Sequence, residues 1–276
     1  MTHLVAVSRR AARDDASERE FPFSVPVIRA LERMDLSAPV TFFVGENGSG
    51  KSTLLEGIAA AAGLPAVGSA DVAHDASLRA QRRLADALRL AWSRRTHRGF
   101  FLRAEDFFGF TKRLAREREE LRRRIEELDA EYREQGRSAY ALGLAQGPPR
   151  ASLAGMERRY GVDLDASSHG QSFLRLFRSR FVPGGLYLLD EPEAPLSPQS
   201  QLALIAMLAD MVAEEAQFVI ATHSPILLAF PGARIYSFDD APPREVPYAE
   251  LEHVTLTREF LREPERFLRL LGEDRT

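Results

Sequence analysis

Apolar residues along the chain fall into two spacings, which predict alternating strands and helices. Residues 52–60 carry helix formers with apolar residues at helical spacing. Apolar runs of strand length occur six times, at residues 4–7, 40–44, 99–102, 186–191, 216–223 and 234–238. Strands that alternate with helices are typical of α/β folds. The pattern therefore predicts an α/β fold.

Two segments have patterns that fit more than one structure. Residues 21–28 are apolar but contain two prolines, so we expect an edge strand or an extended lead-in. Residues 78–92 have the composition of a helix, and their last turns also fit a strand. Phe21 or Phe23 could stack on an adenine base, although an ordinary place in the core is the favoured interpretation.

A long amphipathic helix is predicted over residues 111–137, where one face is apolar and the others carry nearly balanced charge. The apolar face consists of Leu114, Leu121, Ile125, Leu128 and Tyr132. Three acid-first pairs four residues apart favour ion pairs, namely Glu119 with Arg123, Glu120 with Arg124 and Asp129 with Arg133. The charge balance favours a solvated helix over a nucleic-acid surface. We expect residues 143–150, with Pro148 and Pro149, to end this insertion.

A second amphipathic helix is predicted near the C-terminus, over residues 257–271. Its expected buried face consists of Phe260, Leu261, Phe267, Leu268 and Leu271. Residues 63–68 are expected to form a loop after the first helix.

Composition mainly excludes certain classes of protein and kinds of site. The chain has 276 residues, enough for a sizeable core, and a formal net charge of −3, which argues against a surface that coats nucleic acid. It has no cysteine, so neither disulfides nor thiolate metal sites are expected. No apolar run approaches the roughly 20 residues that span a bilayer. We therefore expect no transmembrane segment and a cytoplasmic location.

Residues 45–53 match the phosphate-loop pattern G-x-x-x-x-G-K-[ST] at every position; they are Gly45, Glu46, Asn47, Gly48, Ser49, Gly50, Lys51, Ser52 and Thr53. The loop lies where an apolar strand turns into a helix, so backbone N–H groups and the helix N-terminus can surround phosphate oxygens. Lys51 is expected to reach the β- and γ-phosphates, and the Ser52 hydroxyl to take one Mg²⁺ position. The pattern predicts a nucleoside triphosphate site.

Two later strands end in polar residues that fit the same chemistry. The run at 186–191 ends in Asp190 and Glu191, the Walker B pattern, in which Asp190 holds Mg²⁺ through water and Glu191 polarises the attacking water. The run at 216–223 ends in His223, which can donate a hydrogen bond to the γ-phosphate. Pro225, two residues further on, stops the strand.

This order of motifs resembles the ATP-binding-cassette (ABC) class of ATPases, in the branch of structural-maintenance-of-chromosomes and RecF-type proteins. The class has a Ser-Gly-Gly-Gln-like turn before the Walker B strand. Here Ser168, Gly170 and Gln171 match that turn, and His169 replaces its first glycine. The phrases at residues 39–48, 99–105 and 168–171 also resemble a small bacterial group of predicted stand-alone ABC-like ATPases.

The resemblance implies a P-loop NTPase fold with a mostly parallel sheet flanked by helices and an inserted helical subdomain. The expected division is a nucleotide-binding core at residues 1–65 and 181–276, with an insertion at 66–180. The class places a glutamine near Mg²⁺; Glu105 stands at the matching place as its substitute, and Arg103 is a rival. The loop at 194–198 departs from the usual Ser-x-Leu-Asp pattern that contacts the partner subunit.

The resemblance also implies a mechanism. Two copies would close on two ATP molecules, each site combining Lys51, Ser52, Asp190, Glu191 and His223 of one chain with Ser168 and Gly170 of the other. ATP binding would join a homodimer, and hydrolysis would release it to act on nucleic acid or on a protein partner, in repair, chromosome maintenance or defence. The alternatives are the ATPase subunit of a membrane transporter and a small-molecule kinase.

Overall fold

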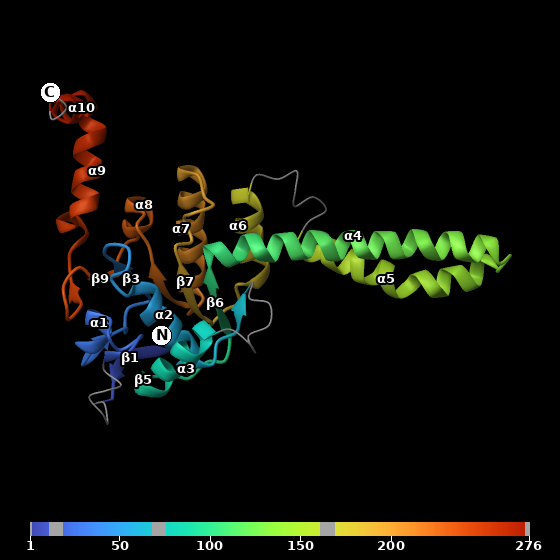
Figure 1. Ribbon diagram of the computed structural model, residues 1–276, viewed down its shortest axis with the longest axis horizontal. Coiled ribbons are helices and arrows are strands. Elements are labelled where there is room, and N and C mark those ends of the chain that lie inside the picture. The colour runs from blue at the N-terminus through green and yellow to red at the C-terminus, as the bar shows by residue number, and fades with distance from the viewer. Residues whose placement is uncertain (1, 11–18, 68–75, 161–168, 274–276) are drawn as a thin grey trace.

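The computed structural model describes residues 2–10, 19–67, 76–160 and 169–273, which form two sheets and a set of helices (Figure 1). The strands are β1 (Leu4–Arg9), β2 (Arg33–Asp35), β3 (Val40–Val44), β4 (Ala66–Val67), β5 (Leu88–Trp92), β6 (Gly99–Arg103), β7 (Leu186–Asp190), β8 (Gln217–Ala221), β9 (Arg234–Ser237) and β10 (Arg244–Glu245). The helices of the first half are α1 (Pro26–Arg29), α2 (Lys51–Ala62), α3 (Ala76–Ala87), α4 (Ala104–Glu134) and α5 (Ala139–Tyr160). Those of the second half are α6 (His169–Arg180), α7 (Pro198–Ala213), α8 (Pro225–Leu228), the 3-10 turn η2 (Tyr248–Glu250), α9 (Glu252–Arg262) and α10 (Pro264–Glu273).

The larger sheet has seven strands in the order β10-β9-β3-β8-β7-β6-β4. All neighbours are parallel except β9 and β10. The predicted mostly parallel sheet is therefore confirmed. Its register places Phe43, Ala221, Asp190 and Arg103 level with one another on four neighbouring strands. The carboxyl ends of β3, β8, β7 and β6 thus meet at one edge of the sheet.

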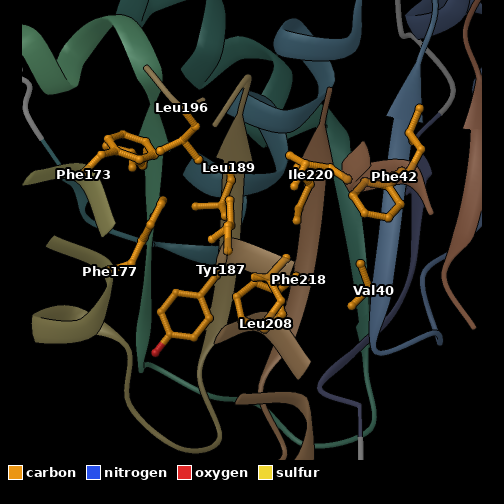
Figure 2. Close-up of a cluster of buried hydrophobic side chains, with 14 of the residues drawn as sticks. Val40, Phe42, Phe173, Phe177, Tyr187, Leu189, Leu196, Leu208, Phe218 and Ile220 are labelled. Carbon is orange, nitrogen blue, oxygen red and sulfur yellow. The ribbon is translucent and has the colours of Figure 1, made fainter. Parts of the chain in front are cut away.

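Both faces of the larger sheet are buried, as expected for parallel strands. Figure 2 shows one face, where Phe42 of β3, Tyr187 of β7 and Phe218 of β8 belong to one buried cluster with Phe173 and Phe177 of α6. Alternate residues such as Phe43 and Val219 point to the opposite face, into a second cluster with α2 and β1. This continuous burial explains why the strand sequences read as unbroken apolar runs.

The smaller sheet is antiparallel, in the order β2-β1-β5, and the side chain of Gln217 joins it to the larger one. The amide oxygen of Gln217 accepts hydrogen bonds from the backbone N–H groups of His3 (2.9 Å) and Leu4 (2.7 Å). Its amide nitrogen donates to the carbonyl oxygens of Leu4 (2.8 Å) and Leu36 (2.6 Å). Gln217 is fully buried, so these bonds form away from water. The ambiguous end of segment 78–92 is β5 of this sheet.

Helices α4 and α5 lie side by side and extend from the sheets as an arm (Figure 1). Leu114 and Leu128 of the predicted apolar face are buried, and buried Gln146 of α5 donates a hydrogen bond to the Ile125 carbonyl oxygen at 3.0 Å. Of the expected ion pairs, Asp129 and Arg133 form one at 2.6 Å. Arg123 and Arg124 instead contact Glu127, at 3.6 Å and 3.5 Å.

Two predictions about proline segments are wrong. Residues 21–28 form no strand, because Pro26 lacks the N–H that a ladder needs and instead occupies the first position of α1, where none is needed. Residues 143–150 do not end the insertion. Pro148 and Pro149 lie inside α5, whose packing along α4 offsets the local penalty of proline.

Two further expectations need correction. The predicted helix over 257–271 is interrupted before Pro264, which begins α10. Of its expected buried face, Leu261 is 73% and Leu268 is 59% exposed, Phe260 contacts Phe267, and the side chain of Leu271 lies outside the described residues. The two leucines are exposed because α9 and α10 extend away from the sheets (Figure 1). The insertion expected from residue 66 contains β4 and β6, which are strands of the larger sheet, so the helical arm begins only at α4.

Candidate nucleotide-binding site

The loop between β3 and α2 has the backbone that the phosphate-loop pattern requires. Gly50 has a φ of 102°, and a Cβ there would lie 2.6 Å from a methyl group of Val27, so only glycine fits. Helix α2 starts directly afterwards at Lys51, and its N-terminus faces the loop. The Ser49 hydroxyl is shielded from solvent and has no hydrogen-bond partner among the described residues. The loop therefore holds a donor that a bound phosphate could satisfy.

Lys51 is buried beneath this loop, with 4% of its surface exposed. Its ammonium donates hydrogen bonds to the carbonyl oxygens of Gly45 (2.6 Å) and Glu46 (2.8 Å). Burial lowers the pKa of Lys51, and the nearby carboxylates of Glu191 and Asp190 act in the opposite direction. The positive charge thus lies between the loop and the acidic strand end.

Ser52 and Asp190 meet at the same edge, where the Ser52 hydroxyl donates to an Asp190 carboxylate oxygen at 3.0 Å. Asp190 is 7% exposed. Burial raises the pKa of its carboxyl to about 6; Glu191 acts in the same direction, while the Ser52 hydrogen bond and the Arg103 and Lys51 charges oppose the shift. A cation at this place would favour the ionised carboxylate.

Glu191 and His223 face each other across the ends of β7 and β8. The carboxylate oxygen Oε1 of Glu191 lies 3.9 Å from Nε2 of His223, and both side chains are nearly half exposed. Glu191 has a φ of 49°, uncommon for a residue other than glycine, and its N–H donates to the Ala221 carbonyl oxygen at 2.8 Å. The strained turn holds the carboxylate at the open side of the strand end.

Two acidic residues missed by the sequence analysis also belong to this edge. Glu193 accepts a hydrogen bond from the His223 backbone N–H at 2.8 Å, and burial raises the pKa of its carboxyl. Asp239 accepts one from the Glu46 backbone N–H at 2.8 Å and so holds the phosphate loop against the end of β9. Their only sequence signal was a carboxylate just beyond a predicted strand.

The two candidates for the missing glutamine lie differently. Arg103, the last residue of β6, pairs with Glu56 of α2, and its charge acts on Asp190. Glu105 lies in the first turn of α4, and its side chain is 80% exposed, with the Arg103 guanidinium 3.8 Å away. Arg103 therefore lies nearer the strand end that carries Asp190, and a metal-binding role for Glu105 stays a prediction.

The expected Ser-Gly-Gly-Gln-like turn is only partly described. Ser168 lies outside the described residues. Gly170 and Gln171 belong to the first turn of α6, and Gly170 packs against the loop after β7, where an added Cβ would lie 3.1 Å from the Pro195 carbonyl oxygen. Neither residue lines the cavity at the phosphate loop. The turn thus adjoins the loop at 194–198 instead of its own chain's nucleotide site.

A cavity of about 970 Å³ opens over the phosphate loop, between α1, the end of β9 and the start of α9. Its lining includes residues 45–49 of the loop and His223. Neither Phe21 nor Phe23 lines it; Phe23 lies in the core and Phe21 is 56% exposed. Pockets for small molecules span about 300–1,000 Å³, so this cavity is large enough for a nucleotide.

The parallel sheet and its phosphate loop define the P-loop NTPase class. Comparison with protein families matches residues 79–229 to the family described as "AAA domain, putative AbiEii toxin, Type IV TA system" and residues 27–71 to an AAA domain. The chain belongs to the first of these families, whose match covers more than half of it. It has the parallel sheet and the phosphate loop of a P-loop protein, and this family match does not favour the transporter-subunit alternative.

Similar solved structures include a nucleotide-free ATP-binding cassette from an ABC transporter, 17% identical, covering 86% of this chain and 87% of that one with a TM-score of 0.44. Another is the Smc head domain from Pyrococcus furiosus bound to the C-terminal domain of ScpA, 12% identical, covering 100% of both chains with a TM-score of 0.43. Comparison with curated proteins finds no match. Among the described residues, no helix is long and apolar enough to cross a membrane.

Proposed function

We propose that the chain hydrolyses ATP at the edge where β3, β7 and β8 end. The observation that carries this proposal is the convergence of Lys51, the Ser52–Asp190 hydrogen bond and the Glu191–His223 pair beside the phosphate loop. Lys51 and the loop N–H groups would bind the phosphates. Glu191 would orient and deprotonate the attacking water, while His223 would contact the γ-phosphate.

The residues present fit a Mg²⁺ ion. Within the described part of the chain, no cluster of three or more histidine or acidic residues could hold a metal alone. Mg²⁺ usually takes one or two protein oxygens together with phosphate oxygens and water. The Ser52 hydroxyl and the buried Asp190 carboxylate supply such oxygens 3.0 Å apart. When bound, the ion would neutralise charge on the phosphates.

The ATPase cycle would act through a homodimer. Gly170 and Gln171 lie away from their own chain's cavity, beside the loop at 194–198, so one surface carries both segments. A second copy could present this surface, with the N-terminus of α6, to the γ-phosphate. ATP would then hold two chains together, and hydrolysis would release them to act on nucleic acid or a protein partner. The family description, which names a toxin–antitoxin system, fits the defence role among those expected.

Glu191→Gln tests the assignment of the base. The variant should bind ATP with unchanged affinity, hydrolyse it at least about 100-fold more slowly because the general base is lost, and accumulate as a dimer. Steady-state phosphate release and light scattering with and without ATP measure these effects. Glu120→Gln, on the exposed arm, is the matched control. A monomeric variant with wild-type turnover would contradict the proposal.

Lys51→Ala tests the nucleotide site itself. Loss of the ammonium should weaken ATP binding at least about tenfold in calorimetry, because it removes a charged contact with phosphate oxygens. An unchanged ATP affinity would show that the nucleotide does not bind at this loop. Release of phosphate without formation of a phosphorylated acceptor would support hydrolysis and exclude the kinase alternative.

A further inference from the structure

The cavity over the phosphate loop has a second half that the phosphates do not explain. Its far wall comes from the C-terminal segment: the loop after β9, then Leu251, and the first turns of α9 with His253 and Leu256. Pro26 and Val27 of α1 also line the cavity. Both segments therefore contribute apolar side chains to the lining.

The charge of this half is unsuited to phosphate. Asp240, Glu250 and Glu252 line it, together with one arginine, Arg244. Phosphate oxygens would be repelled there, whereas the loop N–H groups and Lys51 attract them at the other end. A bound nucleotide would consequently place its uncharged nucleoside, which carries hydroxyl and amino donors, among these carboxylates.

His253 offers a specific contact within the same wall. Its Nε2 atom is shielded from solvent and has no hydrogen-bond partner among the described residues. Burial lowers the pKa of the imidazole, and the charge of neighbouring His223 acts in the same direction. A neutral imidazole can donate or accept at Nε2 according to its tautomer. A shielded nitrogen without a partner is costly, so a ligand that pairs with it gains affinity.

We propose that this wall binds the nucleoside half of the nucleotide, with His253 as a specificity-determining residue that hydrogen-bonds the base or ribose while Val27 and Leu256 contact the base. This proposal rests on the proposed nucleotide site, and it adds which part of the cavity holds the nucleoside end of the ligand. It also assigns the contact to the C-terminal segment rather than to Phe21 or Phe23.

The test compares two probes in calorimetry, ATP and inorganic tripolyphosphate, both with Mg²⁺. His253→Ala should weaken ATP binding about threefold to tenfold, the worth of one hydrogen bond. Tripolyphosphate affinity should stay at the wild-type value, because that probe has no nucleoside. Exposed His97, between β5 and β6, supplies the matched control His97→Ala, which should bind both probes like the wild type.

The two proposals fail differently in this experiment. An ATP affinity unchanged by His253→Ala, or an equal loss for both probes, would overturn the role of His253. Lys51→Ala should weaken both probes, and unchanged binding of both would overturn the phosphate site instead. Because each variant is judged on the ratio of the two affinities, a general loss of folded protein affects both probes alike and cannot imitate the expected result.

Discussion

Asp190 combines two conditions that conflict at the scale of a single residue. Its carboxylate must be ionised to hold a cation, yet burial at the end of β7 raises its pKa to about 6. The Ser52 hydroxyl and the Arg103 and Lys51 charges offset part of that cost. The ionised Asp190 carboxylate therefore destabilises the nucleotide-free protein, and a bound cation would remove this cost. Functional sites commonly give up stability in this way.

Asp190→Asn should accordingly stabilise the nucleotide-free protein, and the gain should depend on pH. The folded-state pKa is raised, so the penalty of ionisation is complete above about pH 6 and is lost as pH falls from about 6 to the unfolded value of 3.8. Each tenfold change in a protonation equilibrium corresponds to about 1.4 kcal/mol, so the raised pKa sets an upper limit of about 3 kcal/mol at pH 8.

Urea unfolding at pH 8 and at pH 4 measures this difference. Asp210→Asn, on the exposed face of α7, is the matched control for loss of one carboxylate. A stability gain of equal size at both pH values would show that packing, rather than the charge of Asp190, is responsible.

The positions of residues within the motifs could be predicted, because each motif implies a particular local backbone conformation and a local arrangement of charge. Lys51, Ser52 and Asp190 lie together as the phosphate loop and the Walker B strand imply. Asp239 and His253 could not be found that way. They come from a loop and a helix that follow the last predicted strand, and only the fold brings them to the cavity.

At the scale of elements, the Gln217 side chain links the two sheets, because its hydrogen bonds connect β8 to β1 and to the residue after β2. Gln217→Leu should leave several buried backbone groups of His3, Leu4 and Leu36 without partners. Each such group costs about 1–3 kcal/mol, so we expect a loss of about 3 kcal/mol or more in the free energy of unfolding.

Guanidinium unfolding followed by circular dichroism measures that loss, with Gln199→Leu at the exposed start of α7 as control. A loss of less than about 1 kcal/mol would mean that water or a shift of β1 replaces the bonds.

Strands are easier to predict than helices in this chain. Burial on both faces leaves long apolar runs in β3, β7 and β8, which are visible in sequence. The errors fall on prolines and on unpartnered faces. Local rules predict a boundary at Pro148 and Pro149 because they ignore the packing of α5 on α4. Helical spacing likewise predicts a buried face over 257–271, although α9 joins the core at Val254 and both helices then extend away from the sheets.

The arrangement of the whole molecule raises the question of which chain completes each site. The phosphate loop and the strand ends share one edge of the sheet, while Gly170 and Gln171 lie beside the loop at 194–198. If Gln171 contacts the nucleotide bound by a second copy, each site takes Lys51 from one chain and Gln171 from the other. A substitution of Lys51 and a substitution of Gln171 then inactivate a site from different chains. Two inactive variants would then complement each other.

Mixing Lys51→Ala with Gln171→Glu tests this. Each variant alone should be nearly inactive, because one lacks the phosphate contact and the other places a carboxylate near the γ-phosphate. In an equal mixture half of the dimers are mixed, and each has one intact site, so about a quarter of the wild-type rate should return. Phosphate release across mixing ratios measures it, and Gln199→Leu mixed with Lys51→Ala controls for dilution. If the mixture stays inactive although light scattering shows mixed dimers, the α6 turn does not complete the partner's site.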